Sequence, residues 1–154
     1  MADPGSTVMR RLTAHTRMLG MVAAGGSLGA PTRYVVGDLW TPPACAFPWS
    51  TFAINIVGAF ALGLLLETLT RSGSDVGRRR SIRLLLGTGF LGTFTTYSSL
   101  VVDTDLLIHH GRIALAAVYA AGSVLVGLCA AGGGMWSAAR LAGPLGHGPT
   151  EASM

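Results

Sequence analysis

The sequence is poor in charge, because only 12% of its 154 residues are Asp, Glu, Lys or Arg. A soluble globular domain carries about 25% charged residues. The shortage of polar surface therefore disfavours both a soluble enzyme and a disordered chain. Half of the residues are hydrophobic and the mean hydropathy is +0.53. Because the apolar residues run along almost the whole length, a single membrane anchor is disfavoured too, and a small membrane protein with several spans remains.

Lysine is absent, and all eleven basic residues are arginine. The net charge of +4 and the pI near 9.8 are those of many nucleic-acid-binding domains. Such domains carry their basic residues along a polar face, which this sequence lacks, so no nucleic-acid partner is expected. Cysteine is also scarce. Cys45 and Cys129 lie in different apolar segments and are interpreted as small buried hydrophobic residues.

Long uncharged runs dominate the rest of the sequence. A bilayer core about 30 Å thick needs about 20 apolar residues per helix. Four spans fit, at residues 18–37, 49–67, 82–108 and 113–136. Residues 1–17 and 137–154 are polar and are predicted to be flexible cytoplasmic tails. A signal peptide at the N-terminus is less favoured, because the first apolar run is rich in glycine and leads into Arg33.

The arginines are distributed unevenly between the two sides of this four-span arrangement. Arg112 lies on one side, Arg33 lies within the first span, and the other nine lie on the side of the N-terminus. These nine are Arg10, Arg11, Arg17, Arg71, Arg78, Arg79, Arg80, Arg83 and Arg140. Since basic residues accumulate on the cytoplasmic side of membrane spans, both termini are predicted to be cytoplasmic. The chain should insert into the cell membrane in one orientation.

Several polar groups fall inside the predicted spans, where they are costly and normally face a partner or a water-filled path. Arg33 is close enough to the end of the first span to reach the interface with its long side chain. Asn55 lies deep in the second span, with Thr51 one turn earlier on the same face. An interhelical hydrogen bond is the alternative interpretation of Asn55. Tyr119 and Ser123 are one turn apart in the fourth span.

The third span is far too polar for a plain lipid-facing helix. Six Ser and Thr residues and three glycines fall between Gly87 and Ser99. Hydroxyl groups that bond back to their own helix account for one or two of them. Helices are interrupted at bilayer depth where their backbone groups line a cavity or coordinate an ion. A broken helix is therefore predicted here, with Asp103 and Asp105 following it.

The polar groups of the four spans are mostly hydrogen-bond donors, and a path lined by donors and an arginine favours an anion. A proton-coupled cation exporter of this size needs a carboxylate in the first span, which is absent. No nucleophile–base pair, phosphate-binding loop or metal-ligand set occurs in the sequence, so no enzymatic activity is expected. The donors are Arg33, Thr51, Asn55, Thr95, Thr96, Ser98, Ser99, Tyr119 and Ser123.

Three motifs resemble those of the CrcB/Fluc family of fluoride channels. The family pattern GGxxGAxxRY is similar to Gly25-Gly-Ser-Leu-Gly-Ala-Pro-Thr-Arg-Tyr34. The pattern TxxxNxxG of the second span is similar to Thr51-Phe-Ala-Ile-Asn-Ile-Val-Gly58. The pattern GxxGxxTTFST of the third span is similar to Gly89-Phe-Leu-Gly-Thr-Phe-Thr-Thr-Tyr-Ser-Ser99. The resemblance covers residues 25–103, is looser in the fourth span and does not extend to the tails.

The resemblance implies an all-α integral membrane fold with four transmembrane helices per subunit and a third helix broken mid-membrane. Two subunits would pair antiparallel around two narrow pores that conduct fluoride passively out of the cytoplasm. Arg33 would lie at the vestibule, and backbone oxygens of Gly92 and Thr95 from both subunits would bind a central structural Na⁺. The residues implied to line the pores are Asn55, Thr51, Thr96, Tyr97, Ser98, Leu100, Tyr119 and Ser123.

One part of the family pattern is changed. The family has two phenylalanines three residues apart, whose electropositive ring edges contact fluoride; this sequence has Tyr97 and Leu100 instead, with Phe90 and Phe94 nearby but out of register. A homodimer that inserts both ways would also need a small charge bias. We therefore hypothesise a heterodimer with a paralogous subunit of opposite orientation, with the homodimer as the alternative.

Other functions stay open. The changed aromatic positions are compatible with a non-conducting assembly or regulatory subunit. A four-span small-molecule exporter is disfavoured by the missing carboxylate in the first span, and a membrane-embedded enzyme by the lack of catalytic groups.

Overall fold

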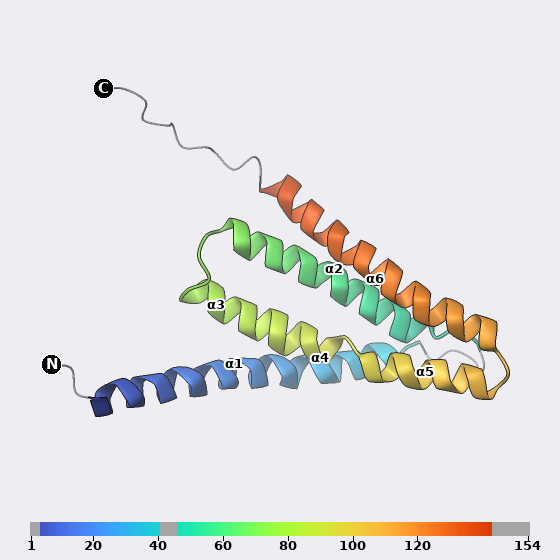
Figure 1. Ribbon diagram of the computed structural model, residues 1–154, viewed down its shortest axis with the longest axis horizontal. Coiled ribbons are helices and arrows are strands. Elements are labelled where there is room, and N and C mark those ends of the chain that lie inside the picture. The colour runs from blue at the N-terminus through green and yellow to red at the C-terminus, as the bar shows by residue number, and fades with distance from the viewer. Residues whose placement is uncertain (1–3, 41–45, 143–154) are drawn as a thin grey trace, which may run out of the picture.

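The computed structural model describes residues 4–40 and 46–142, and every regular element within these ranges is a helix (Figure 1). The predicted all-α class is therefore confirmed. Residues 1–3 and 143–154 of the predicted tails lie outside the described residues, as do Pro42, Pro43 and Cys45.

The helices form four rods. The first rod is α1 (Pro4–Asp38), the second is α2 (Trp49–Arg71) and the last is α6 (Ile113–Leu141). The third rod consists of four segments that follow one another along the chain. These are α3 (Arg78–Ile82), the π-helix η1 (Arg83–Leu91), α4 (Gly92–Phe94) and α5 (Tyr97–His109).

All four rods extend beyond the predicted spans, and the first and last reach into the predicted tails. Helix α1 begins at Pro4, so residues 4–17 are helical where a flexible tail was expected, and α6 continues to Leu141. Residues 6–19 contain neither glycine nor proline, and polar residues with ordinary helix propensity extend a helix that is already nucleated. The change from apolar to polar residues therefore shows where the apolar segment begins, but it does not show where the helix begins.

Three rods are long and apolar enough to cross a membrane, namely Trp49–Arg71, Arg78–His109 and Ile113–Leu141. They make the chain a multi-pass membrane protein. Helix α1 is long enough but is not among the three, because glycines, Pro31 and Arg33 lower the hydropathy of its second half. The fourth predicted span, residues 18–37, therefore stays a prediction.

The rods pack as two pairs. Helix α2 runs along α6, and α1 runs along η1 and α4, while α5 packs against the beginning of α6 (Figure 1). The described N-terminal end of α1, the loop between α2 and α3, and the C-terminal end of α6 all lie at one end of the molecule (Figure 1). The turn between α5 and α6 lies at the other.

Glycine brings α1 and η1 into contact. A Cβ atom at Gly25 would lie 2.8 Å from the Phe90 nitrogen and 3.0 Å from the Gly89 Cα, and would also overlap the Leu85 carbonyl oxygen. A Cβ atom at Gly29 would overlap the Phe90 carbonyl oxygen. Lipid tails are as apolar as leucine, so this close backbone approach is what holds two such helices together.

Glycines also bring the backbones of α2 and α6 into close contact. Gly63 faces the backbone of Ala131, and Gly134 faces the backbone of Phe60, with no room for a Cβ atom at either glycine. Gly122 of α6 has no atom within 4 Å of an added Cβ, and Gly127 has only the Ile56 Cδ1 at 3.9 Å. Gly134 makes the contact about two turns beyond Gly127 along α6.

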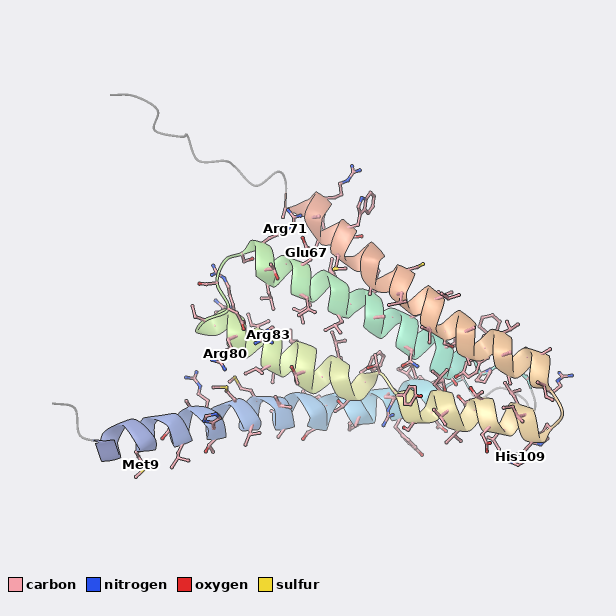
Figure 2. The ribbon with its side chains drawn as sticks, in the orientation of Figure 1. Met9, Glu67, Arg71, Arg80, Arg83 and His109 are labelled. Carbon is pink, nitrogen blue, oxygen red and sulfur yellow. The ribbon has the colours of Figure 1, made fainter. Side chains whose placement is uncertain are left out.

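Three of the nine arginines that the sequence assigned to one side of the membrane lie at the same end of the molecule. Arg71, Arg80 and Arg83 are at one end of the molecule, and His109 is at the other (Figure 2). Two of these arginines are neutralised within the chain, since Arg71 pairs with Glu67 at 2.6 Å and Arg83 pairs with Asp75 at 2.5 Å.

The glycine contacts lead to a prediction about stability. Gly25→Leu should lower the midpoint of thermal unfolding in detergent by about 5–10 °C, because the new side chain forces α1 away from η1. Gly20→Leu is the matched control, since it lies on the same helix with open space around it. Equal midpoints for the two variants would show that the α1–η1 contact does not stabilise the fold.

Candidate functional site

The third rod is interrupted at Thr95 and Thr96. Helix α4 ends at Phe94 and α5 begins at Tyr97, with Thr95 at ψ 156° and Thr96 at φ −147° and ψ 125°. Both residues are extended, so the backbone groups around them lose their partners in a regular helix. The interruption falls in the polar stretch where the sequence predicted it, while its depth in the bilayer stays a prediction.

Asn55 of α2 supplies the missing partners. Its Nδ2 donates to the Thr96 carbonyl oxygen at 2.9 Å, and its Oδ1 accepts from the Thr96 N–H at 2.8 Å. The side-chain amide thus pairs with the Thr96 backbone as a neighbouring β-strand would. The interhelical hydrogen bond, which was the alternative interpretation of Asn55, is confirmed.

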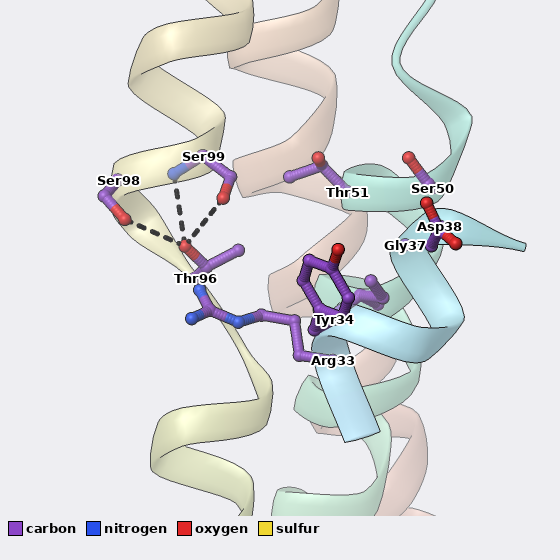
Figure 3. A pocket seen from close by; sticks show the side chains of 10 residues that line it. Arg33, Tyr34, Gly37, Asp38, Ser50, Thr51, Thr96, Ser98 and Ser99 are labelled. Atoms are coloured by element: carbon purple, nitrogen blue, oxygen red, sulfur yellow. Dashed lines mark hydrogen bonds between the residues drawn. The ribbon is translucent and has the colours of Figure 1, made fainter. Parts of the chain in front are cut away.

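The hydroxyl group of Thr96 begins α5. Its Oγ1 accepts from the Ser99 N–H at 3.1 Å, in the manner of a helix N-cap. The same Oγ1 donates to the Ser99 Oγ at 3.1 Å and lies 3.1 Å from the Ser98 Oγ (Figure 3). Because Thr96 has one hydroxyl proton, Ser98 must be the donor in the last contact. The Ser99 proton is then left for a further acceptor.

These hydroxyl groups border a cavity of about 480 Å³ between α1, α2 and the break (Figure 3). The cavity brings together five of the donors that the sequence singled out, Arg33, Thr51, Thr96, Ser98 and Ser99. The sequence did not assign a role to the other lining residues, which are Tyr34, Gly37, Asp38, Ser50 and Ile54.

The lining of this cavity suits an anion. It holds one guanidinium, five Ser and Thr hydroxyl groups and the Tyr34 side chain, against a single carboxylate, Asp38, which has an interaction of its own. Charged and hydroxyl donors that converge on one space favour a small acceptor such as an anion. Arg33, which could equally have extended to the membrane surface, is half-buried at this wall.

Tyr119 and Ser123 of α6 do not reach the cavity. Tyr119 is fully buried, and its hydroxyl donates to the Asp103 Oδ2 at 3.1 Å. The Ser123 hydroxyl donates to the Tyr119 carbonyl oxygen at 2.6 Å, within its own helix. The Phe47 ring meets the Tyr119 ring edge-on, with centroids 5.3 Å apart. Within a single chain, Tyr119 belongs to the cluster with Leu107 and Ala116 that joins α5 to α6.

The two positions that depart from the family pattern have opposite surroundings. Tyr97 is 78% exposed. Leu100 is half-buried and packs against the cluster of Leu107, Ala116 and Tyr119, while its expected place at a pore stays a prediction. Leu100 and Leu107 are seven residues apart, so they share the face of α5 that meets α6. Leu100 therefore contributes to the contact between α5 and α6 within this chain.

Phe90, Phe94 and Cys129 are further side chains on which the sequence analysis commented. Phe90 and Phe94 stack on each other, 5.9 Å apart and tilted by 7°, and pack with Ile54 rather than beside Tyr97. Cys129, interpreted as buried, is exposed on the surface of α6 and is not disulfide-bonded.

Fold and site together define a class of protein: a helical multi-pass membrane protein with a donor-lined cavity beside a helix break. A family model described as "CrcB-like protein, Camphor Resistance (CrcB)" matches residues 20–135. The chain belongs to this CrcB-like family. The match includes α1 from Gly20 onward and nearly all of α6, so the looser fourth span is covered as well.

Curated relatives carry one shared name. The chain is 49% identical over 110 residues to the fluoride-specific ion channel FluC of Novosphingobium aromaticivorans, which covers 70% of this chain and 84% of the relative. It is 44% identical over 110 residues to FluC 1 of Cutibacterium acnes, and the match covers 71% of this chain and 77% of the relative. It is 44% identical over 116 residues to FluC 2 of Leifsonia xyli subsp. xyli, and the match covers 75% of this chain and 79% of the relative.

The pairing of Asn55 with Thr96 can be tested by hydrogen exchange. Asn55→Ala removes two hydrogen bonds, each worth about 1 kcal/mol, so amide exchange in residues 92–99 should be about 30-fold faster. Thr104→Val is the control, because the hydroxyl it removes bonds only to Leu100 within α5. Unchanged protection in Asn55→Ala would mean that the break is held by other contacts.

Proposed function

We propose that this chain is a subunit of a fluoride-specific channel that lets fluoride leave the cytoplasm passively. The observation that carries the proposal is the cavity at the break, where Arg33 and five Ser and Thr hydroxyl groups converge. Its size is that of a vestibule, in which an anion gathers before it enters a narrower path. The names of the curated relatives support fluoride as that anion. A channel of this kind needs no catalytic groups, in line with the expectation that the chain is not an enzyme.

Fluoride sets a demanding requirement, because it is small and strongly hydrated. Removing its water is costly unless hydrogen-bond donors replace the lost contacts one for one. The Ser99 hydroxyl proton, which no described group accepts, is one such donor. Asn55 offers another, since only one of its two amide N–H groups is used by Thr96. Thr51, Ser98, Tyr119 and Ser123 would extend the path once a partner subunit completes it.

The proposal includes a definite position in the membrane. Helix α1 would be the fourth span, and the break at Thr95 and Thr96 would lie near the middle of the bilayer. Both termini would be cytoplasmic in a plasma or inner membrane, because Arg71, Arg80 and Arg83 lie at the same end as the two described termini.

A structural Na⁺ fits the break. In a continuous helix the Gly92 carbonyl oxygen would accept from the Thr96 N–H, but that group donates to Asn55. Gly92 is also exposed, with no atom closer than 3.7 Å to an added Cβ. Backbone oxygens of Gly92 and Thr95 would hold the ion, as unwound helix carbonyls do. The ion would neutralise the carbonyl dipoles and join two subunits at this point.

The chain would act with a second subunit. Tyr97 and Gly92 are both exposed beside the break, where a partner would cover them. A paralogous subunit of opposite orientation would supply the aromatic ring that Leu100 does not provide. The strong arginine bias disfavours antiparallel pairing of two identical chains.

Fluoride efflux from liposomes tests the function and the partner together. The purified chain alone should release little fluoride, and the chain co-reconstituted with an oppositely biased paralogue should release it rapidly and in preference to chloride. Thr51→Val in the complex should slow the release at least tenfold, because a donor in the cavity is lost. Ser27→Ala is the control, since its hydroxyl bonds within α1 and faces outward.

Two results would contradict parts of this proposal. Fast efflux from the chain alone would establish a homodimer and refute the argument from charge bias. No efflux in either preparation would refute the channel and favour a regulatory subunit or a small-molecule exporter, which a proton-dependent transport assay would separate.

A further inference from the structure

A second cavity, of about 180 Å³, lies between α1 and α3 at the arginine-rich end of the molecule. It is separate from the cavity at the break and shares no residue with it. Helix α1 contributes four residues at the spacing i, i+3, i+4, i+7, which lie on one helix face. The other four come from the N-cap of α3, from α3 itself and from the start of η1. These residues are Ala14, Arg17, Met18 and Met21 from one side, and Gly77, Arg80, Ser81 and Leu84 from the other.

The two sides of the cavity begin with the same kinds of residue in the same order along the chain. A small residue comes first, at Ala14 and Gly77, and an arginine follows on each helix. Gly77 has φ +55° and no atom within 4 Å of an added Cβ, so the mouth of the cavity is open there. Met18, Met21 and Leu84 line the part further into the bundle. The cavity is thus cationic at its mouth and apolar toward the membrane.

The two arginines differ from their neighbours in charge pairing. Arg71 and Arg83 form ion pairs with Glu67 and Asp75. Within residues 4–40 and 46–142, neither Arg17 nor Arg80 has a carboxylate or hydrogen-bond partner. Arg80 lies on the side of α3 that faces α1 (Figure 2). Two unneutralised guanidinium groups from different helices therefore border one opening.

We propose that this cavity binds the phosphate headgroup of an anionic phospholipid, with the start of an acyl chain along Met18, Met21 and Leu84. Guanidinium groups recognise phosphate through paired hydrogen bonds, and basic pockets between membrane helices bind anionic headgroups. A free phosphate ion would use the arginines but not the apolar floor. The lipid joins α1 to α3 and steadies the helix that carries Gly25 and Gly29.

Native mass spectrometry of the detergent-solubilised chain, titrated with dioleoyl phosphatidylglycerol or dioleoyl phosphatidylcholine, tests the proposal. The chain should retain phosphatidylglycerol preferentially. The double variant Arg17→Gln/Arg80→Gln should bind it about 30-fold more weakly, at about a factor of five per arginine. The double variant Arg78→Gln/Arg140→Gln removes the same charge outside the cavity and should bind within threefold of the unmodified chain.

Three outcomes would overturn the proposal: equal binding of the two lipids, equal weakening in both double variants, or displacement of the lipid by millimolar inorganic phosphate. The last would assign the cavity to a free anion. Circular dichroism of each variant shows whether it is folded. If the double variant is unfolded, the single variant Arg80→Gln replaces it, with an expected fivefold loss of affinity for phosphatidylglycerol. None of these results depends on fluoride conduction.

Discussion

The side-chain amide of Asn55 holds an interrupted helix together inside a membrane protein. Without it, the N–H and carbonyl groups of Thr96, a buried residue, would both lack these partners. Each hydrogen bond is modest by itself, but leaving a buried polar group unsatisfied costs about 1–3 kcal/mol. Because the amide satisfies both groups at once, the chain can remain extended at Thr95 and Thr96.

The rest of the site follows from that extension. Since α5 starts anew at Tyr97, the Thr96 hydroxyl becomes its N-cap and gathers Ser98 and Ser99 around it. The same geometry frees the Gly92 carbonyl from its helical donor. The break must also be fixed relative to α1, which carries Arg33. The glycine contacts of α1 with η1 do this, because they allow backbone to meet backbone without flexible side chains between. Packing and site chemistry therefore depend on each other across α1, α2 and the third rod.

Much of this arrangement could be predicted from the sequence, because lipid imposes simple rules on composition. Uncharged runs marked three apolar rods, and the density of hydroxyl groups and glycines marked the helix interruption. The four-residue spacing of Thr51 and Asn55 placed them on one face of α2, although only Thr51 lines the cavity. What could not be predicted is tertiary pairing. Asn55 and Thr96 are 41 residues apart, and no local pattern shows which backbone group an amide meets. Similarly, the direction in which α5 leaves the break places Leu100 against the cluster of Leu107, Ala116 and Tyr119, and the sequence contains no signal for that direction.

The central claim is that the amide which holds the break also serves the anion path. Fluoride efflux by the complex of this chain with its partner, measured for Asn55→Ala against the unmodified chain, tests it most directly. The account predicts a loss of at least tenfold, since both the backbone support and the spare amide N–H are removed. An unchanged rate would show that Asn55 supports the fold without taking part in conduction, and would contradict the claim.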